Sequence, residues 1–205
     1  INTPSMRLLY FPEHASSFTL PFRCRSVGVS TFQHGESSGF VPKDYWSLSW
    51  VTSGTIRLRF AQNAYTLKKG NAVVIPPQTP RQFTAPDGSA HMRTCSAKGE
   101  LLSGLFASLG LSPPSILHPG QCPENDFAEL EEYTVNVTSA GTRHACSVLF
   151  RILLQAFRPH SEQPLSHCSM LVEKALHLIE QRLNDQGLDI NLLAENSGCS
   201  RGHLS

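Results

Sequence analysis

The feature that most constrains the fold of this chain is a change in hydrophobic periodicity near residue 100. Between Cys24 and Ala97 apolar and polar residues alternate in short runs, for example over 46–50, and turn signals such as Ser53-Gly54 and Pro76-Pro77 separate the runs. A period of two is typical of β-strands with one buried face. Many short strands at this spacing predict a barrel or a sandwich.

After Gly99 the period becomes helical. Residues 101–109 predict a short helix that Gly110 ends, and Pro113-Pro114 and Pro119-Gly120 predict an irregular connector. A stronger amphipathic helix follows, whose apolar stripe is formed by Ala145, Val148, Leu149, Ile152, Leu153 and Ala156. Three further apolar residues widen this stripe: Phe150, Leu154 and Phe157. We therefore expect the helix to contact two surfaces, either its own domain on all sides or its own domain and a partner subunit.

The last part of the chain predicts a helix, a turn and the start of another helix. Asp189 suits the N-cap of a helix that begins at Ile190, and Gly198 suits the left-handed residue that ends it. Ser200 suits the cap of the next helix. This order is that of a helix-turn-helix unit.

Two stretches of the sequence resemble the arabinose-regulator (AraC-type) transcription factors. In residues 189–205 the similarity is carried by Ile190, Leu193-Ala194, Ser197-Gly198, Ser200 and Leu204-Ser205, which match the opening of that family's first helix-turn-helix. In the strand region it is carried by 45–54, Leu67, Gly70, Val74-Ile75-Pro76-Pro77 and Phe83, which match its cupin-like sensor barrel.

The resemblance implies an α+β fold in three parts. Residues 1–99 form a cupin-like β-barrel that binds an effector, residues 100–163 form a helical dimerisation region and linker, and residues 164–205 begin a DNA-binding domain. The expected function is ligand-responsive transcription regulation. The expected partners are a small-molecule effector (a sugar or an organic acid), a second copy of the chain and, for the full-length protein, operator DNA.

Six residues are candidates for binding the effector: Trp46, Trp50, Arg81, Phe83, Arg93 and Thr94. Arg81 either holds a carboxylate, phosphate or sugar hydroxyl at the barrel mouth or is an exposed turn residue. The two tryptophans either stack on a ligand or belong to the core. Arg81 also stands where metal-binding cupins have a histidine. No H-x-H pair occurs in the chain, so we expect no metal and no other cofactor.

Five residues are candidates for binding DNA: Ser200, Arg201, Gly202, His203 and Ser205. The sequence stops where the first recognition helix would begin, and residues 160–205 carry 3 Lys and Arg against 6 Asp and Glu. A basic surface that neutralises phosphates is therefore not predicted. We expect this sequence to be part of a longer protein and, by itself, not to bind an operator specifically.

The sequence offers no nucleophile–base arrangement and no phosphate-binding glycine loop, so we expect no enzyme activity. Two alternatives remain: a metal-dependent cupin enzyme, and a dimerisation module whose interior is filled and binds no ligand. The six cysteines form no C-x-x-C pair, which is typical of buried thiols in the cytoplasm. No apolar run approaches the ~20 residues that span a bilayer.

Overall fold

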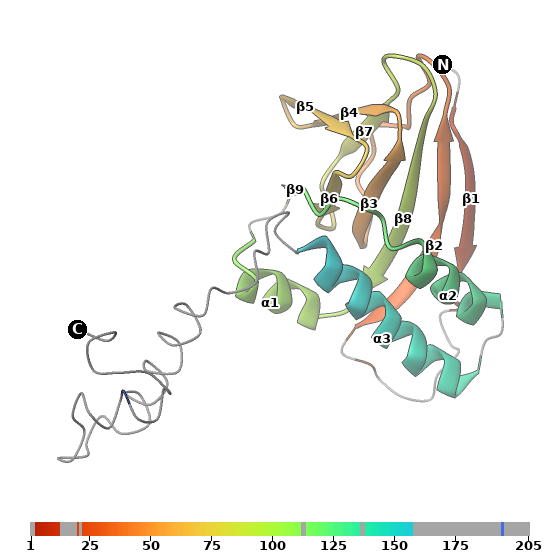
Figure 1. Ribbon diagram of the computed structural model, residues 1–205, viewed down its shortest axis with the longest axis vertical. Helices are drawn as coiled ribbons and strands as arrows, with labels where there is room; N and C mark the ends of the chain where they lie inside the picture. Colours follow the sequence, from red (N-terminus) through yellow and green to blue (C-terminus); the bar gives the residue numbers. More distant parts are fainter. Residues whose placement is uncertain are drawn as a thin grey trace. The chain divides into compact units, whose positions relative to one another are not determined.

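The computed structural model describes residues 3–12, 20, 22–111, 114–135, 138–157 and Ala194 (Figure 1). The chain divides into two compact units, residues 1–160 and 161–205. In the second unit Ala194 is buried and has a helical backbone. Apart from Ala194, the helix-turn-helix predicted at 189–205 lies outside the described residues, and so do all five candidate DNA-binding residues. The fold below is that of the first unit.

Nine strands of the described residues form two antiparallel sheets. The large sheet has the order β1-β2-β8-β3-β6-β9, and the small sheet has the order β5-β4-β7. The strands of the large sheet are β1 (Ser5–Tyr10), β2 (Arg23–Phe32), β3 (Trp46–Ser53), β6 (Ala72–Ile75), β8 (Ala90–Lys98) and β9 (Ser115–Leu117). The strands of the small sheet are β4 (Thr55–Phe60), β5 (Asn63–Lys68) and β7 (Arg81–Thr84).

The prediction of a β-rich domain is confirmed, but the prediction of a closed barrel is wrong for the described residues. The described strands form two separate sheets, and β7 is an edge strand of the small one. Its outer edge is met only by isolated bridges, Ser37 to Thr84 and Val41 to Arg81.

The turn between the two sheets depends on Gly54. Its φ of +73° is a conformation that L side chains rarely adopt, and it links the end of β3 to the start of β4. A Cβ atom added there would lie 2.3 Å from the carbonyl oxygen of Ser89. The turn predicted at Ser53-Gly54 is therefore confirmed, and the position also requires glycine for lack of space.

The central strands of the large sheet have two unlike faces. On β3 the large side chains Leu48 and Trp50 join the core beneath the helices, whereas Ser47 and Ser49 point to the space between the sheets. Strand β8 repeats the pattern, with Cys95 toward the helices and Thr94 toward the other sheet. This is the alternation of a pleated strand, and here both of its faces are covered by protein.

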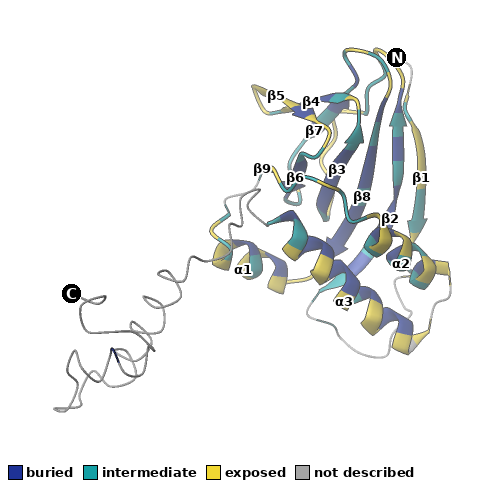
Figure 2. Cartoon of the chain, viewed as in Figure 1, coloured by how far each residue is buried: buried dark blue, intermediate teal, exposed yellow. Residues whose placement is uncertain are grey.

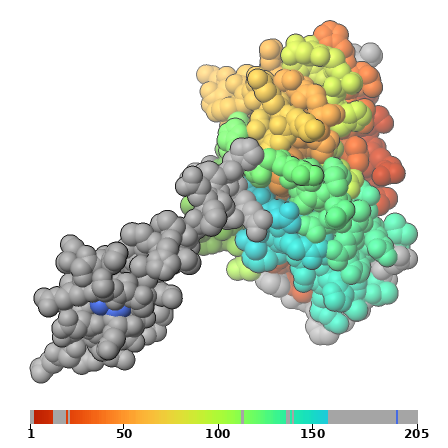
Figure 3. Space-filling view, viewed as in Figure 1, coloured from red at the N-terminus to blue at the C-terminus, as the bar shows by residue number. Residues whose placement is uncertain are grey.

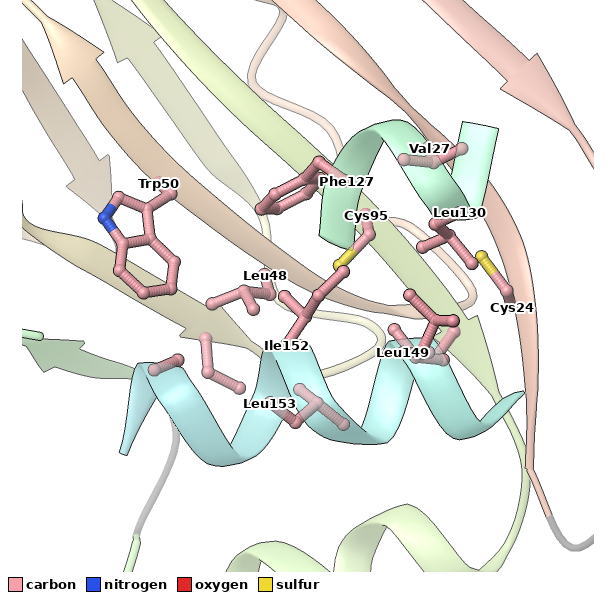
Figure 4. Close-up of a cluster of buried hydrophobic side chains, with 14 of the residues drawn as sticks. Cys24, Val27, Leu48, Trp50, Cys95, Phe127, Leu130, Leu149, Ile152 and Leu153 are labelled. Carbon is pink, nitrogen blue, oxygen red and sulfur yellow. The ribbon is translucent and has the colours of Figure 1, made fainter. Parts of the chain in front are cut away.

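Three helices contribute to the face of the large sheet that carries the tryptophans: α1 (Leu101–Ser108), α2 (Glu124–Val135) and α3 (Ser139–Ala156). The stripe predicted on α3 is confirmed, since all six of its residues are buried. Figure 4 shows Leu149, Ile152 and Leu153 of α3 on the same side as Trp50 and Leu48, with Phe127 and Leu130 of α2 beside them. None of the described helices has the length and apolar character needed to span a membrane.

A second apolar cluster lies between the two sheets. Its members include Phe32, Leu58, Phe83 and Met92. Figure 2 shows how buried and exposed residues are distributed along the strands. In the space-filling view of Figure 3, α2 and α3 (green to cyan) gather at one end of this unit, and the β4–β5 hairpin (orange to yellow) lies at the other.

Candidate ligand-binding cavity

The space between the sheets contains a cavity of about 230 Å³. Strands β1, β2, β3 and β8 of the large sheet line one side, and β7 with the segment 38–45 lines the other. The cavity reaches the surface, because Tyr10 and Val41 on its rim are 56% and 45% exposed. The interior of the sandwich is therefore not filled by side chains.

The wall formed by the large sheet carries a group of hydroxyl side chains. The register of the strands places them next to one another, since Ser96 pairs with Ser26 on one side and with Ser47 on the other, and Thr94 pairs with Ser49. Their oxygens are close enough to bond, at 2.6 Å between Ser26 and Ser96 and 3.1 Å between Ser49 and Thr94. The complete set is Ser26, Ser30, Ser47, Ser49, Thr94 and Ser96.

One of these hydroxyls is left without a partner. Ser47 is 4% exposed, and its Oγ forms no hydrogen bond to any of the described residues. A buried hydroxyl that makes no hydrogen bond costs free energy relative to the same group in water. Ser47 is also one of the residues that line the cavity.

The opposite wall carries positive charge. Arg81 is 7% exposed, and its Nη1 donates a long hydrogen bond of 3.5 Å to the Thr79 carbonyl oxygen. Its Cζ lies 5.7 Å from the centre of the Tyr45 ring, and Lys43 also lines the cavity. Burial lowers the pKa of Arg81 and Tyr45 opposes that change. An arginine keeps its proton in proteins even so.

No Asp or Glu lines the cavity in the part of the chain that the structure describes. The carboxylate next in sequence to Lys43 is that of Asp44, which lies 2.6 Å from Lys98 Nζ. This hydrogen bond lowers the pKa of Asp44. The rest of the lining is mainly apolar and is contributed by Met6, Leu8, Phe32, Phe83 and Met92.

The structure brings together three of the six residues predicted to bind a ligand. Arg81, Phe83 and Thr94 line the cavity. The interpretation of Arg81 as an exposed turn residue is wrong, because the side chain begins β7 and is buried. That these three residues bind a ligand stays a prediction.

The other three, Trp46, Trp50 and Arg93, lie on the opposite face of the large sheet. The Trp46 ring lies 4.4 Å from that of Phe106, and Trp50 Nε1 donates to the Gly120 carbonyl oxygen at 3.0 Å. Both tryptophans therefore belong to the core with the helices, which was the second interpretation offered for them. The positions of β3 that face the space between the sheets are its serines.

Arg93 is held by α2 instead of facing the cavity. Its Nη1 lies 2.6 Å from Glu131 Oε1, and its Nε lies 3.0 Å from Glu124 Oε2. Its Cζ also lies 5.1 Å from the centre of the Phe127 ring. Neighbouring residues of a strand point to opposite faces, so Met92 and Thr94 line the cavity and Arg93 does not.

Sequence reasoning missed the hydroxyl wall, Lys43 and Tyr45. The signal for Ser47 and Ser49 was present, since they are the polar half of the alternation in 46–50. No signal near Lys43 or Tyr45 separates them from other surface residues. Among the described residues no three His, Cys, Asp or Glu side chains gather as metal ligands would. His91 Nδ1 lies 3.1 Å from Thr31 Oγ1.

Comparison with known protein families identifies the domain that holds this cavity. The model of the AraC-like ligand binding domain matches residues 33–176, which include most strands of the sandwich and all three helices. The chain belongs to this family. The family model is that of a ligand-binding domain, and the cavity lies within the residues it matches or beside them. The fold of this AraC-like domain is a cupin-like sandwich of antiparallel sheets with a few helices.

Solved structures similar to the AraC-like domain include several cupins. A Cupin 2 conserved barrel domain protein from Salinispora arenicola has 18% identity and a TM-score of 0.37, covering 50% of this chain and 83% of its own. The Cnp3 cupin domain from Schizosaccharomyces pombe has 13% identity and a TM-score of 0.39, covering 55% and 74%. No curated protein sequence is similar enough to this chain to count as a match.

Proposed function

We propose that this AraC-like domain is the effector sensor of a transcription regulator. The observation that carries the proposal is the cavity between the sheets, whose buried walls hold an arginine and a serine hydroxyl that lack full partners. Ligand pockets are typically apolar with a few convergent polar groups, and this cavity has that composition. A ligand in this position stabilises whichever arrangement of the domain it binds more tightly.

A reporter assay tests the proposal. The full-length regulator is expressed in cells with a reporter gene under its own upstream region, and the cells are grown on a set of single carbon sources. We expect reporter output to depend on the carbon source. Ser49→Phe should abolish this dependence because the new ring fills the cavity. Thr66→Phe, on an exposed position of β5, is the matched control and should behave as wild type.

Two results would contradict the sensor proposal. One is a reporter whose output is the same on every carbon source and does not change when the regulator is deleted. The other is a Ser49→Phe variant that folds, as judged by its unfolding transition, and still responds as wild type. In the second case the cavity is not where the signal enters.

The proposal extends to the partners of the full-length protein. It acts in the cytoplasm as a homodimer on operator DNA, through a helix-turn-helix that includes Ser200, Arg201, Gly202, His203 and Ser205. The resemblance at 189–205 supports the DNA-binding part. We also propose that the domain is not an enzyme, and stoichiometric iron, zinc or manganese in the purified protein would contradict this.

The outer face of α3 is the proposed dimer contact. Phe150 and Leu154 are one helical turn apart and are 37% and 44% exposed, so two large apolar side chains are neighbours on this face of α3. Leu154→Glu should shift the chain from dimer to monomer in light scattering, because it places a charge in the contact. Gln62→Glu adds the same charge in an exposed turn and should leave the dimer intact. A Leu154→Glu variant that stays dimeric would contradict this contact.

The cavity also bears on the alternative of a dimerisation module without a ligand. That alternative requires an interior filled by Trp46, Leu48, Trp50 and Phe83. Phe83 lies between the sheets, whereas the other three side chains pack on the other face of the large sheet. The proposal of a sensor is therefore favoured over it.

A further inference from the structure

We infer that the ligand of this cavity is a small organic carboxylate that also carries a hydroxyl group, with its carboxylate on Arg81 and its hydroxyl on Ser47. The inference rests on the proposed function in one respect: it takes the cavity as the effector site. It goes further by naming the charge and the functional groups of the effector.

The comparison of two arginines in the same domain carries the inference. Arg81 and Arg93 are both 7% exposed. Arg93 has two carboxylates within 3.0 Å, those of Glu131 and Glu124. Arg81 takes part in none of the ion pairs among the described residues; its polar contacts there are the Thr79 carbonyl oxygen, 3.5 Å from Nη1, and the Tyr45 side chain. A buried charge is costly unless it is paired, so the Arg81 guanidinium requires an anion that the described residues do not supply.

The surroundings of Arg81 favour a negative ligand as well. Lys43 lines the same cavity, and no acidic residue of the described chain does. The closest acidic side chain in sequence, Asp44, is already paired with Lys98. A cavity wall with charges of one sign attracts ligands of the opposite sign.

The size of the site and its hydrogen-bond donors suit a small carboxylate. A guanidinium matches a carboxylate with two parallel hydrogen bonds. A volume of about 230 Å³ equals that of about eight water molecules, which suits a ligand of roughly ten non-hydrogen atoms. A phosphate group has the same bidentate match to a guanidinium, so inorganic phosphate is one of the probes in the test below.

The opposite wall defines the remainder of the ligand. The Ser47 hydroxyl is buried and has no partner among the described residues, whereas Ser26 and Ser96 already bond to each other. Phe32 and Met92 add an apolar surface beside it. A short hydrocarbon chain with one hydroxyl group, in addition to the carboxylate, satisfies both walls.

Calorimetric titration of the chain Ile1–Ser205 tests the inference with four probes: 3-hydroxyhexanoate, its uncharged amide, inorganic phosphate and D-glucose. We expect 3-hydroxyhexanoate to bind at least tenfold more tightly than each of the others. Arg81→Gln should weaken 3-hydroxyhexanoate at least tenfold and leave the amide unchanged, because the charge-assisted hydrogen bonds are lost. Arg57→Gln removes an exposed arginine of the same small sheet and should leave all affinities unchanged.

A second series tests the hydroxyl contact. Ser47→Ala should weaken 3-hydroxyhexanoate about threefold to tenfold, the usual effect of one neutral hydrogen bond. It should leave hexanoate, which has no hydroxyl group, unchanged. Equal losses for the two acids would overturn the role of Ser47.

Several outcomes would overturn the inference. They are binding of the amide, phosphate or glucose at least as tightly as the carboxylate, an Arg81→Gln variant of unchanged affinity, or no detectable binding of either carboxylate. None of these outcomes decides the sensor proposal, which the reporter assay tests separately. A ligand-free measurement adds a further criterion: Arg81→Met should unfold at or above the temperature of the wild type, since it removes an unpaired buried charge. A large decrease would make Arg81 a structural residue instead.

Discussion

Arg93 on β8 and Glu131 on α2 form a buried ion pair, with 2.6 Å between Nη1 and Oε1, and this pair ties the large sheet to the helix that covers it. The side chains are 8% and 19% exposed. Arg93 also lies over the Phe127 ring and reaches Glu124 at the start of α2. Helix α2 is therefore held on the sheet by ion pairs and by the Phe127 contact at the same place.

Removing one partner of this pair should destabilise the domain. Glu131→Gln should lower the free energy of unfolding by about 2–4 kcal/mol, because it leaves the Arg93 charge buried with one carboxylate fewer. Lys98→Gln breaks an ion pair whose Asp44 side chain is 62% exposed, and it should lower the free energy of unfolding much less. Urea denaturation of the variants measures both. Equal losses for the two substitutions would show that the Arg93–Glu131 pair stabilises the domain no more than an exposed ion pair does.

The turn at Gly54 should tolerate no side chain. Gly54→Ala should cost more than about 2 kcal/mol, since it adds a steric clash with the Ser89 carbonyl to the cost of a positive φ. Gly35→Ala is a close control because its φ is +75° and nothing lies within 4 Å of the new Cβ. It should cost only about 1 kcal/mol. The comparison of their unfolding midpoints isolates the clash, and a smaller loss at Gly54 than at Gly35 would refute it.

The buried stripe of α3 should contribute more to the free energy of unfolding than the outer face of the helix does. Ile152→Ala should cost about 2–5 kcal/mol because the side chain is fully buried and leaves a cavity. Leu154→Ala, 44% exposed on the same helix, should cost less than about 1 kcal/mol in the monomeric chain. Thermal unfolding at low protein concentration gives the comparison. A larger loss at Leu154 than at Ile152 would mean that α3 is covered on its other side.

The buried thiols should make the domain less stable at alkaline pH. Burial raises the pKa of Cys95 from 9.0 to about 12 and also raises that of Cys24. Below pH 9 the thiols are protonated in both the folded and the unfolded chain. Between pH 9 and 12 the unfolded chain releases their protons while the folded chain retains them. The free energy of unfolding should therefore fall as the pH rises, by about 1.4 kcal/mol per pH unit for each such thiol.

Urea denaturation at pH 8 and pH 10 measures this slope. Cys95→Ala should have a smaller slope than the wild type, since one ionising thiol is gone. Cys122 and Cys146 lie nearer the surface, and their pKa values are also raised. Cys146→Ala is therefore a control for the loss of a thiol that is less buried. A slope unchanged by Cys95→Ala would exclude Cys95 as its source.

The sequence predicts the elements of this fold better than it predicts the faces of the strands. The alternation of Trp46, Leu48 and Trp50 with serines correctly indicates a strand. It does not indicate which face meets the cavity, because both faces of β3 are buried, one by helices and one by the small sheet. Large side chains are expected inside, and here the larger apolar core is the one shared with the helices.

Helix α2 and the short strand β9 show a second limit. The buried residues of α2 are Phe127, Leu130 and Thr134, and only two of them are apolar. The hydrophobic periodicity of this acidic helix is therefore weak in the sequence. Strand β9 has three residues and exists because it pairs with β6. The partners of Arg93 lie 31 and 38 residues further along the chain. Only the packing of α2 on the sheet brings them within reach.

The alternating side chains of β8 place the cavity and the helices on opposite sides of one layer of backbone. Thr94 is bonded to Ser49 on the inner side, and Arg93, its neighbour in sequence, is bonded to Glu131 on the outer side. Thr94 and Arg93 share a peptide group, so a movement of the backbone at Thr94 also moves Arg93. The strand that forms one wall of the chamber is therefore also the strand to which α2 is attached.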